Sequence, residues 1–239
     1  MRRLERHRKP EVALPAVDTL PTIVVLSRYA DIFERCRVSL SLIAPSAPKI
    51  LVRDGDAIGQ PEGWQVIQGP PGAFCYAHNA NLGIQACSGD VLLMNDDCQF
   101  TQAGTLHTLA SLFITHPHVG ILSPNIDGVA NGVFCSGQPI QETKGYLSFV
   151  CVLIRRALID KIGLLDERFT NYGSEDVDLC RRAQLAGFTL AITSLATVSH
   201  RQASSSYGRE GDLELKRAES ARTYLEKWGR KTQGHYADE

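Results

Sequence analysis

Three consecutive polar residues, Asn95, Asp96 and Asp97, directly follow the apolar run Val-Leu-Leu-Met at positions 91–94. Such a run is typical of a buried strand, so the two carboxylates are expected at the carboxyl edge of a sheet. Oxygen ligands suit Mg²⁺ and Mn²⁺, which use one or two protein carboxylates when they bridge a diphosphate. An Asp pair after a strand is at least as often a simple turn. The motif alone therefore leaves a metal site and a turn both open.

A second acidic cluster lies in the segment 172–179, where Glu175, Asp176 and Asp178 follow Ser174. Ser174 is a suitable N-cap, and acidic side chains in a first helical turn are stabilised by the helix dipole. This structural explanation needs no catalysis. A carboxylate at such a position can also act as a general base toward a substrate hydroxyl, and only its neighbours can decide between the two.

Two further polar residues are expected at strand ends. His200 ends a short strand predicted at 197–199, and Asp54 follows a strand predicted at 49–52. A lone histidine is more often structural than a ligand, and Asp54 could equally be a turn residue. What these residues share with Asp97 is their position at a strand end, where ligands of α/β sheets bind.

The first half of the chain alternates short β-branched runs with longer helical stretches, which predicts an α/β fold with a mainly parallel sheet covered on both faces. The expected strands are 22–26, 49–52, 65–67, 90–94 and 119–122, and the expected helices are 31–43, 76–87 and 104–115.

The second half is less regular and contains no internal repeat or linker. The expected strands are 132–136, 146–154, 188–193 and 197–199, and the expected helices are 156–162, 175–186 and 212–228. The predicted domain organisation is a flexible basic arm at 1–20, a single domain at 21–230 with a nucleotide-binding half (21–125) and an acceptor and catalytic half (126–230), and a tail at 231–239.

Composition excludes several classes of protein. The 239 residues carry 25 Lys and Arg against 26 Asp and Glu, so no overall positive charge favours nucleic-acid binding. No apolar run reaches the roughly 18 to 20 residues that span a bilayer, and no signal peptide is evident. The seven cysteines include no Cys-x-x-Cys pair, and we expect all of them to be reduced thiols. These features predict a soluble, unexported globular protein.

Several separate segments together resemble the family-two glycosyltransferases of the GT-A fold. The resemblance covers about 22–228, and the order and spacing of the segments carry it, since each is unspecific alone. It rests on Ala-His-Asn-Ala-Asn-Leu-Gly-Ile at 77–84, Gly-Asp-Val-Leu-Leu-Met-Asn-Asp-Asp at 89–97, Phe-Val-Cys-Val-Leu-Ile-Arg-Arg at 149–156, Ile-Gly-Leu-Leu-Asp-Glu-Arg-Phe at 162–169, and 172–179 with Arg181 and Gly187-Phe188. It implies a single-domain, Rossmann-like GT-A fold with a mainly parallel central sheet flanked by helices.

The resemblance also implies roles for the acidic residues. Asp97 would be the metal-binding carboxylate, with His200 as a further ligand of the metal or the diphosphate. Asn95 stands where the family often has a first Asp, so metal binding would depend on Asp97 and His200. Asp176 would remove the proton of the acceptor hydroxyl, and Glu175 would orient the acceptor or the helix.

The family also implies a metal-dependent, inverting transfer from a nucleotide-diphosphate sugar, with Mn²⁺ or Mg²⁺ and with UDP expected before GDP or dTDP. Asp96 would contact the donor ribose or the metal, and Asp54 the base. The remaining residues expected at the donor are Ser27, Tyr29, His78 and Asn79.

The expected acceptor is a hydroxyl of a glycan or a lipid-linked saccharide, as in polysaccharide biosynthesis. The expected location is the cytoplasm, with peripheral contact at the inner face of the membrane. Two other functions stay open: a non-catalytic nucleotide-sugar or glycan-binding subunit of the same fold, and a sugar nucleotidyltransferase. The second is disfavoured because 27–31, after the first strand, reads Ser-Arg-Tyr-Ala-Asp without glycine, whereas a phosphate loop is Gly-rich.

Overall fold

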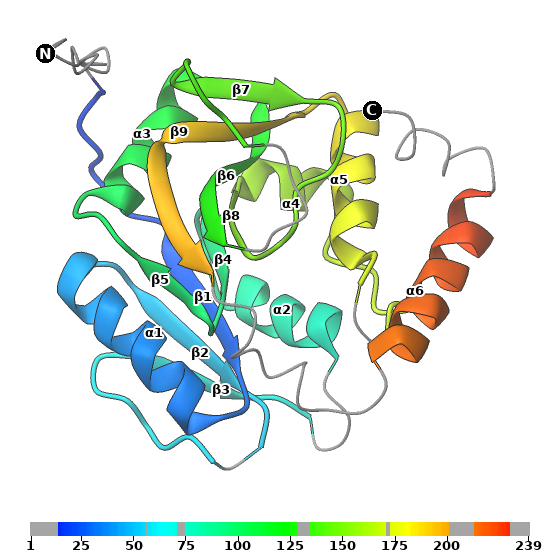
Figure 1. Cartoon of the computed structure of the whole chain (residues 1–239), viewed down its shortest axis with the longest axis horizontal. Coiled ribbons are helices and arrows are strands. Elements are labelled where there is room, and N and C mark those ends of the chain that lie inside the picture. The colour runs from blue at the N-terminus through cyan, green and yellow to red at the C-terminus, as the bar shows by residue number, and fades with distance from the viewer. Residues whose placement is uncertain are drawn as a thin grey trace, which may run out of the picture.

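A computed structural model describes residues 14–55, 57–70, 75–128, 134–170, 173–200 and 213–229. The elements alternate between strands and helices along most of the chain (Figure 1). In chain order they are β1 (Thr22–Ser27), α1 (Ala30–Ile43), β2 (Lys49–Arg53), β3 (Gln65–Gln68), α2 (Tyr76–Gln85), β4 (Val91–Asn95), β5 (Cys98–Phe100), α3 (Thr105–Thr115), β6 (Val119–Gly128), β7 (Ile140–Thr143), β8 (Cys151–Ile154), α4 (Arg156–Ile162), α5 (Glu175–Leu185), β9 (Thr189–His200) and α6 (Leu213–Trp228).

All the strands belong to one mixed sheet with the order β3-β2-β1-β4-β8-β6-β9-β5, and β7 pairs with β9. Strands β3, β2, β1 and β4 are parallel, as the sequence predicts for the first half. The rest of the sheet departs from this pattern, because β8 runs antiparallel to β4 and β6, and both β7 and β5, which still belongs to the first half, run antiparallel to β9. Apolar runs show that these strands are buried but carry no information on their direction.

Alternate residues of the buried strands point into two hydrophobic clusters, one on each face of the sheet. On β1, Ile23 and Val25 face α1 and α3, whereas Val24 and Leu26 face α2, α4 and α5. Figure 1 shows these two groups of helices on opposite sides of the sheet. Burial of each such side chain contributes about 1.5–3 kcal/mol, so the double layer fixes the strand ends that carry the polar residues.

Four expectations for the strands need correction. The strand predicted at 146–154 is limited to β8, and 134–136 is not a strand, while 132 and 133 lie outside the described residues. The strands predicted at 188–193 and 197–199 form one strand, β9, with a register shift opposite Pro124/Asn125. β5 and β7 were not predicted, because both are short and lack an apolar run.

The described part of the predicted flexible arm lies against the domain. Leu14 and Leu20 pack on the cluster that contains α1 and α3, and Ser111 Oγ on α3 donates a hydrogen bond of 2.8 Å to the carbonyl of Pro15. The docked chain thus begins before the boundary expected at residue 20, because two apolar side chains anchor it. Residues 1–13 lie outside the described residues.

All seven cysteines are free in the structure, and all but Cys75 are buried. Within the ranges that the structure describes, no helix combines the length and the apolar character needed to cross a membrane.

Candidate active site

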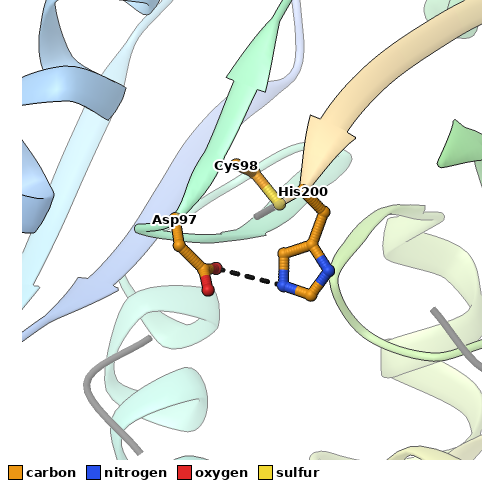
Figure 2. Close-up of side chains that lie close together, drawn as sticks. All are labelled: Asp97, Cys98 and His200. Atoms are coloured by element: carbon orange, nitrogen blue, oxygen red, sulfur yellow. Dashed lines mark ion pairs between the residues drawn. The ribbon is translucent and has the colours of Figure 1, made fainter. Parts of the chain in front are cut away.

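Asp97 and His200 come together through the antiparallel pairing of β5 and β9. Asp97 lies in the tight turn between β4 and β5, and His200 is paired with Cys98, the first residue of β5. His200 Nε2 lies 3.2 Å from Asp97 Oδ1, and both side chains are at most 5% exposed. Figure 2 shows the carboxylate and the imidazole ring facing each other. The structure therefore joins two residues that lie 103 positions apart in the sequence.

The chemistry of this pair fits a divalent cation. Neither carboxylate oxygen of Asp97 has a hydrogen-bond partner among the described residues, although both are buried. A buried carboxylate without hydrogen bonds is costly, and a cation bound between Asp97 and His200 would offset that cost. Cys98 lies within the same group of potential ligands. Burial raises the pKa of its thiol well above the ordinary value, so Sγ keeps its proton and donates to the carbonyl of Val150.

Asp96 has a different environment from its neighbour. Ser27 Oγ, at the end of β1, donates a hydrogen bond of 2.6 Å to Asp96 Oδ2, and both residues are buried. This contact connects the ends of the adjacent strands β1 and β4. Two neighbouring aspartates thus differ in their partners, since Asp96 accepts from a protein hydroxyl and Asp97 faces the imidazole.

Asp54 and Asn79 lie at the same edge of the sheet, beyond β1. Asp54 follows β2, is 2% exposed, and has its Oδ2 3.7 Å from Arg28. Asn79 is buried on α2 with its amide oxygen close to Gly69, where a side chain would collide with it at 2.9 Å. Tyr29 is the N-cap residue of α1 and so also follows β1. Asp54, predicted from its strand end, and Tyr29 and Asn79, expected from the resemblance, are thus gathered at one edge of the parallel half.

His78 lies on the more exposed side of α2. Its Nδ1 is 2.9 Å from Glu167 Oε2, and Asn81 Nδ2 donates to the other carboxylate oxygen of Glu167 at 2.8 Å. Asn81 also exchanges two hydrogen bonds with the backbone of Leu165. The segment around 165–167 is therefore fixed to α2, a contact that the sequence motifs do not reveal.

Glu175 and Asp176 begin α5, and the backbone there is unusual because Gly173 and Ser174 both have positive φ. Glu175 is 4% exposed and its Oε2 has no hydrogen-bond partner among the described residues. Burial, and then the charge of Asp176, raises the pKa of Glu175. Burial also raises the pKa of Asp176, and backbone N–H groups of Val177 and Phe149 oppose this rise. The two carboxyls form an interacting pair that binds protons more readily than isolated side chains.

Phe149 and Val150 connect the two acidic groups. The carbonyl of Val150 accepts hydrogen bonds from the backbone of Asn95 and from Cys98 Sγ, next to Asp97. Phe149 N–H contacts Asp176, and the Phe149 carbonyl accepts a bond of 2.9 Å from Tyr76. The turn that carries Asp97 and the start of α5 that carries Asp176 therefore both contact this short segment.

Gly128 is a sequence position whose importance only the structure shows. It pairs with His200 at the end of β6, has φ of +127°, and a Cβ there would lie 2.0 Å from the His200 carbonyl. If His200 holds a metal ion, Gly128→Ala should displace His200 and weaken Mn²⁺ binding by about tenfold or more, measured by calorimetric titration. Gly163→Ala is the control, since it also has positive φ but has open space around its Cβ position. Equal Mn²⁺ affinities in the two variants would contradict this prediction.

No known protein-family profile matches the chain. The N-acetylglucosaminyl-diphospho-decaprenol L-rhamnosyltransferase of Mycobacterium tuberculosis is 26% identical over 247 residues, which cover 81% of this chain and 79% of that protein.

Three solved structures share the fold. GalNAc-T7 with UDP, GalNAc and Mn²⁺ has a TM-score of 0.61 at 12% identity, and the match covers 77% of this chain and 44% of that one. S. aureus TarS 1–349 has a TM-score of 0.60 at 14% identity, covering 92% and 76%. The mannosyltransferase PcManGT of Pyrobaculum calidifontis, in complex with GDP-Man and Mn²⁺, has a TM-score of 0.59 at 13% identity, covering 81% and 60%.

These matches agree with the motif resemblance in the sequence and with the mixed sheet described above. The relative is similar over most of both chains, and the solved structures share the arrangement of strands and helices. The chain is thus a glycosyltransferase with the GT-A fold, whose sequence motifs resemble those of family two.

Proposed function

We propose that this glycosyltransferase is metal-dependent and inverting, and that it moves a sugar from a nucleotide-diphosphate donor to a hydroxyl of a glycan or lipid-linked acceptor. The observation that carries the proposal is the buried Asp97 carboxylate, which has no hydrogen-bond partner among the described residues and faces His200. Asp176 lies on the other side of Phe149 and Val150. This arrangement supports a donor at Asp97 and an acceptor hydroxyl at Asp176.

The donor would lie along the carboxyl edge of β1, β2 and β4. Asp54 and Tyr29 would contact the nucleoside, and Asp96, held by Ser27, would accept a hydrogen bond from the ribose. Asn79 is suited to this edge because its buried amide oxygen has no hydrogen-bond partner among the described residues. His78, which contacts Glu167, would approach the diphosphate from α2.

Asp97 and His200 would hold Mn²⁺ or Mg²⁺, and the bound ion would neutralise charge on the leaving diphosphate. Asp176 would accept the proton of the acceptor hydroxyl as its oxygen attacks the anomeric carbon and the bond to the diphosphate breaks. Attack from the face opposite the leaving group inverts the configuration. Glu175, buried beside Asp176, would orient the start of α5 rather than take the proton.

The comparisons support the class of donor and acceptor. Two of the structural neighbours were solved with a nucleotide or nucleotide sugar and Mn²⁺, and the Mycobacterium relative is named for a diphospho-decaprenol acceptor. We therefore propose UDP, GDP or dTDP as the donor nucleotide and a polyprenyl-diphosphate saccharide as the acceptor. Such an acceptor would require peripheral contact with the inner face of the membrane.

A thermal-shift panel tests donor binding directly. The purified chain is mixed with UDP, GDP, dTDP or CMP, each with and without Mn²⁺. One nucleoside diphosphate is expected to raise the melting temperature only when Mn²⁺ is present, since a ligand at 100 times its Kd stabilises by about 2.7 kcal/mol. No shift with any diphosphate would overturn the proposed donor site. A metal-dependent shift without turnover of the corresponding donor sugar would instead favour the non-catalytic binding subunit.

A further inference from the structure

The end of α6 is fixed to the first turn of α5 by a buried group of charges. Lys227 Nζ lies 2.7 Å from Asp178 Oδ1 and 2.6 Å from Asp166 Oδ2. Trp228 Nε1 donates a hydrogen bond of 2.9 Å to the same Asp178 Oδ1. The Asp178 side chain is 0% exposed, so α6 supplies two of the groups that compensate this buried carboxylate.

The other groups around Asp178 belong to α5 itself. Arg182 Nε donates 2.8 Å to Asp178 Oδ2, and the rest of its guanidinium donates to the carbonyls of Ile162 and Leu164. Arg181 lies over the Trp228 ring at 4.3 Å. Arg182 thus ties α5 to the segment 162–164, whereas Lys227 and Trp228 tie Asp178 to α6. Removing one partner of a buried charge is costly, so Lys227 should matter for the position of this turn.

The turn held by α6 is the one that carries Asp176. The backbone N–H of Asp178 donates to the carbonyl of Ser174, which is the first hydrogen bond of the helix. Asp176 and Asp178 are two residues apart and thus about 200° apart around the helix axis. α6 therefore contacts the side of α5 opposite Asp176. Gly173 and Ser174, directly before α5, both have positive φ, so neither of them extends the helix by a further residue.

We propose that Lys227 and Trp228 are positioning residues for transfer: by fixing Asp178, they set the orientation of Asp176 toward the acceptor hydroxyl. This inference rests on the proposed role of Asp176 as the general base. It adds that the last turn of α6, which lies about 50 residues after Asp178 in the sequence, holds Asp176 in the orientation that proton transfer requires. Small misplacements of reacting groups can cost up to about 100-fold in rate.

The test is Lys227→Met in the full chain, with Arg222→Met as the matched control. Arg222 lies on the same helix, and its side chain is 74% exposed in a pair with Glu226. We expect Lys227→Met to lower kcat by about 10- to 100-fold while the affinity for Mn²⁺ and the nucleoside diphosphate stays unchanged. Lys227→Arg, which keeps the charge, should recover most of kcat. Equal kcat values for Lys227→Met and Arg222→Met would overturn the proposal.

A second measurement separates positioning from general stability. If Lys227 acts through Asp176, the double variant Asp176→Asn/Lys227→Met should be no slower than Asp176→Asn alone, because effects on one catalytic unit do not add. A further tenfold loss in the double variant would show that Lys227 acts elsewhere. If Lys227→Met does not fold, Trp228→Phe serves instead, since it keeps an aromatic side chain next to Arg181 and removes the indole N–H that donates to Asp178, together with part of the ring. An inactive wild-type chain would count against the proposed function and not against this contact.

Discussion

Asp97→Ala is expected to abolish metal-dependent donor binding and to reduce transfer below detection. Asp97 supplies the only carboxylate in the group formed with Cys98 and His200 within the described residues. Removing it leaves the His200 imidazole and a protonated thiol, which hold a hard divalent cation poorly. Asp96 cannot replace it without losing the 2.6 Å hydrogen bond from Ser27.

The measurement for Asp97→Ala is the nucleoside diphosphate titration with and without Mn²⁺, together with initial transfer rates. The control is Asp160→Ala, which removes an exposed aspartate on α4 whose carboxylate lies 3.9 Å from Arg156. Circular dichroism spectra of both variants should match that of the wild type, which would show that a loss of binding does not result from unfolding. Metal-dependent binding of wild-type strength in Asp97→Ala would place the cation elsewhere and would refute the assignment.

The positions of Asp97 and His200 show what a sequence can predict here. Each was placed at a strand end by the pattern of apolar residues, and the parallel half of the sheet has the strands expected from that pattern. Their contact depends on β5, which has only three residues and no apolar run of its own. Its pairing with β9 is a long-range contact, so the resemblance to a family, rather than periodicity, was the signal that linked the two residues.

The contacts around Asp178 lay outside the predictions from sequence for a different reason. Three acidic residues at the start of a helix are explained by the helix dipole alone, and Lys227 is one basic residue among several on a charged helix. Asp166 gives no local signal either, although hydrogen bonds from Arg168 and then Lys227 hold its pKa well below the ordinary value. Which of these charges is buried depends on how α6 packs, and packing is a property of the whole fold.

Asp176→Asn is expected to lower kcat by about 10² to 10⁴, the usual contribution of a general base, with little change in Mn²⁺-dependent nucleotide binding. The amide keeps the shape of the side chain but cannot accept the proton of the acceptor hydroxyl. Glu175→Gln is the matched control. Because burial and the charge of Asp176 raise the pKa of Glu175, its neutral form is favoured and glutamine resembles that form. A larger loss in Glu175→Gln than in Asp176→Asn would reverse the two roles.

The pH dependence of kcat gives an independent test of the same residue. A general base must be deprotonated, so kcat should fall as the pH drops through the pKa of the Glu175–Asp176 pair. Since burial raises the pKa of Asp176, this fall should occur well above the value of about 3.9 for a free aspartate. In Asp176→Asn the residual kcat should no longer show this fall at low pH, which is the acidic limb of the pH profile. If the limb persists unchanged in Asp176→Asn, another group carries the proton, and the acceptor hydroxyl must lie away from the start of α5.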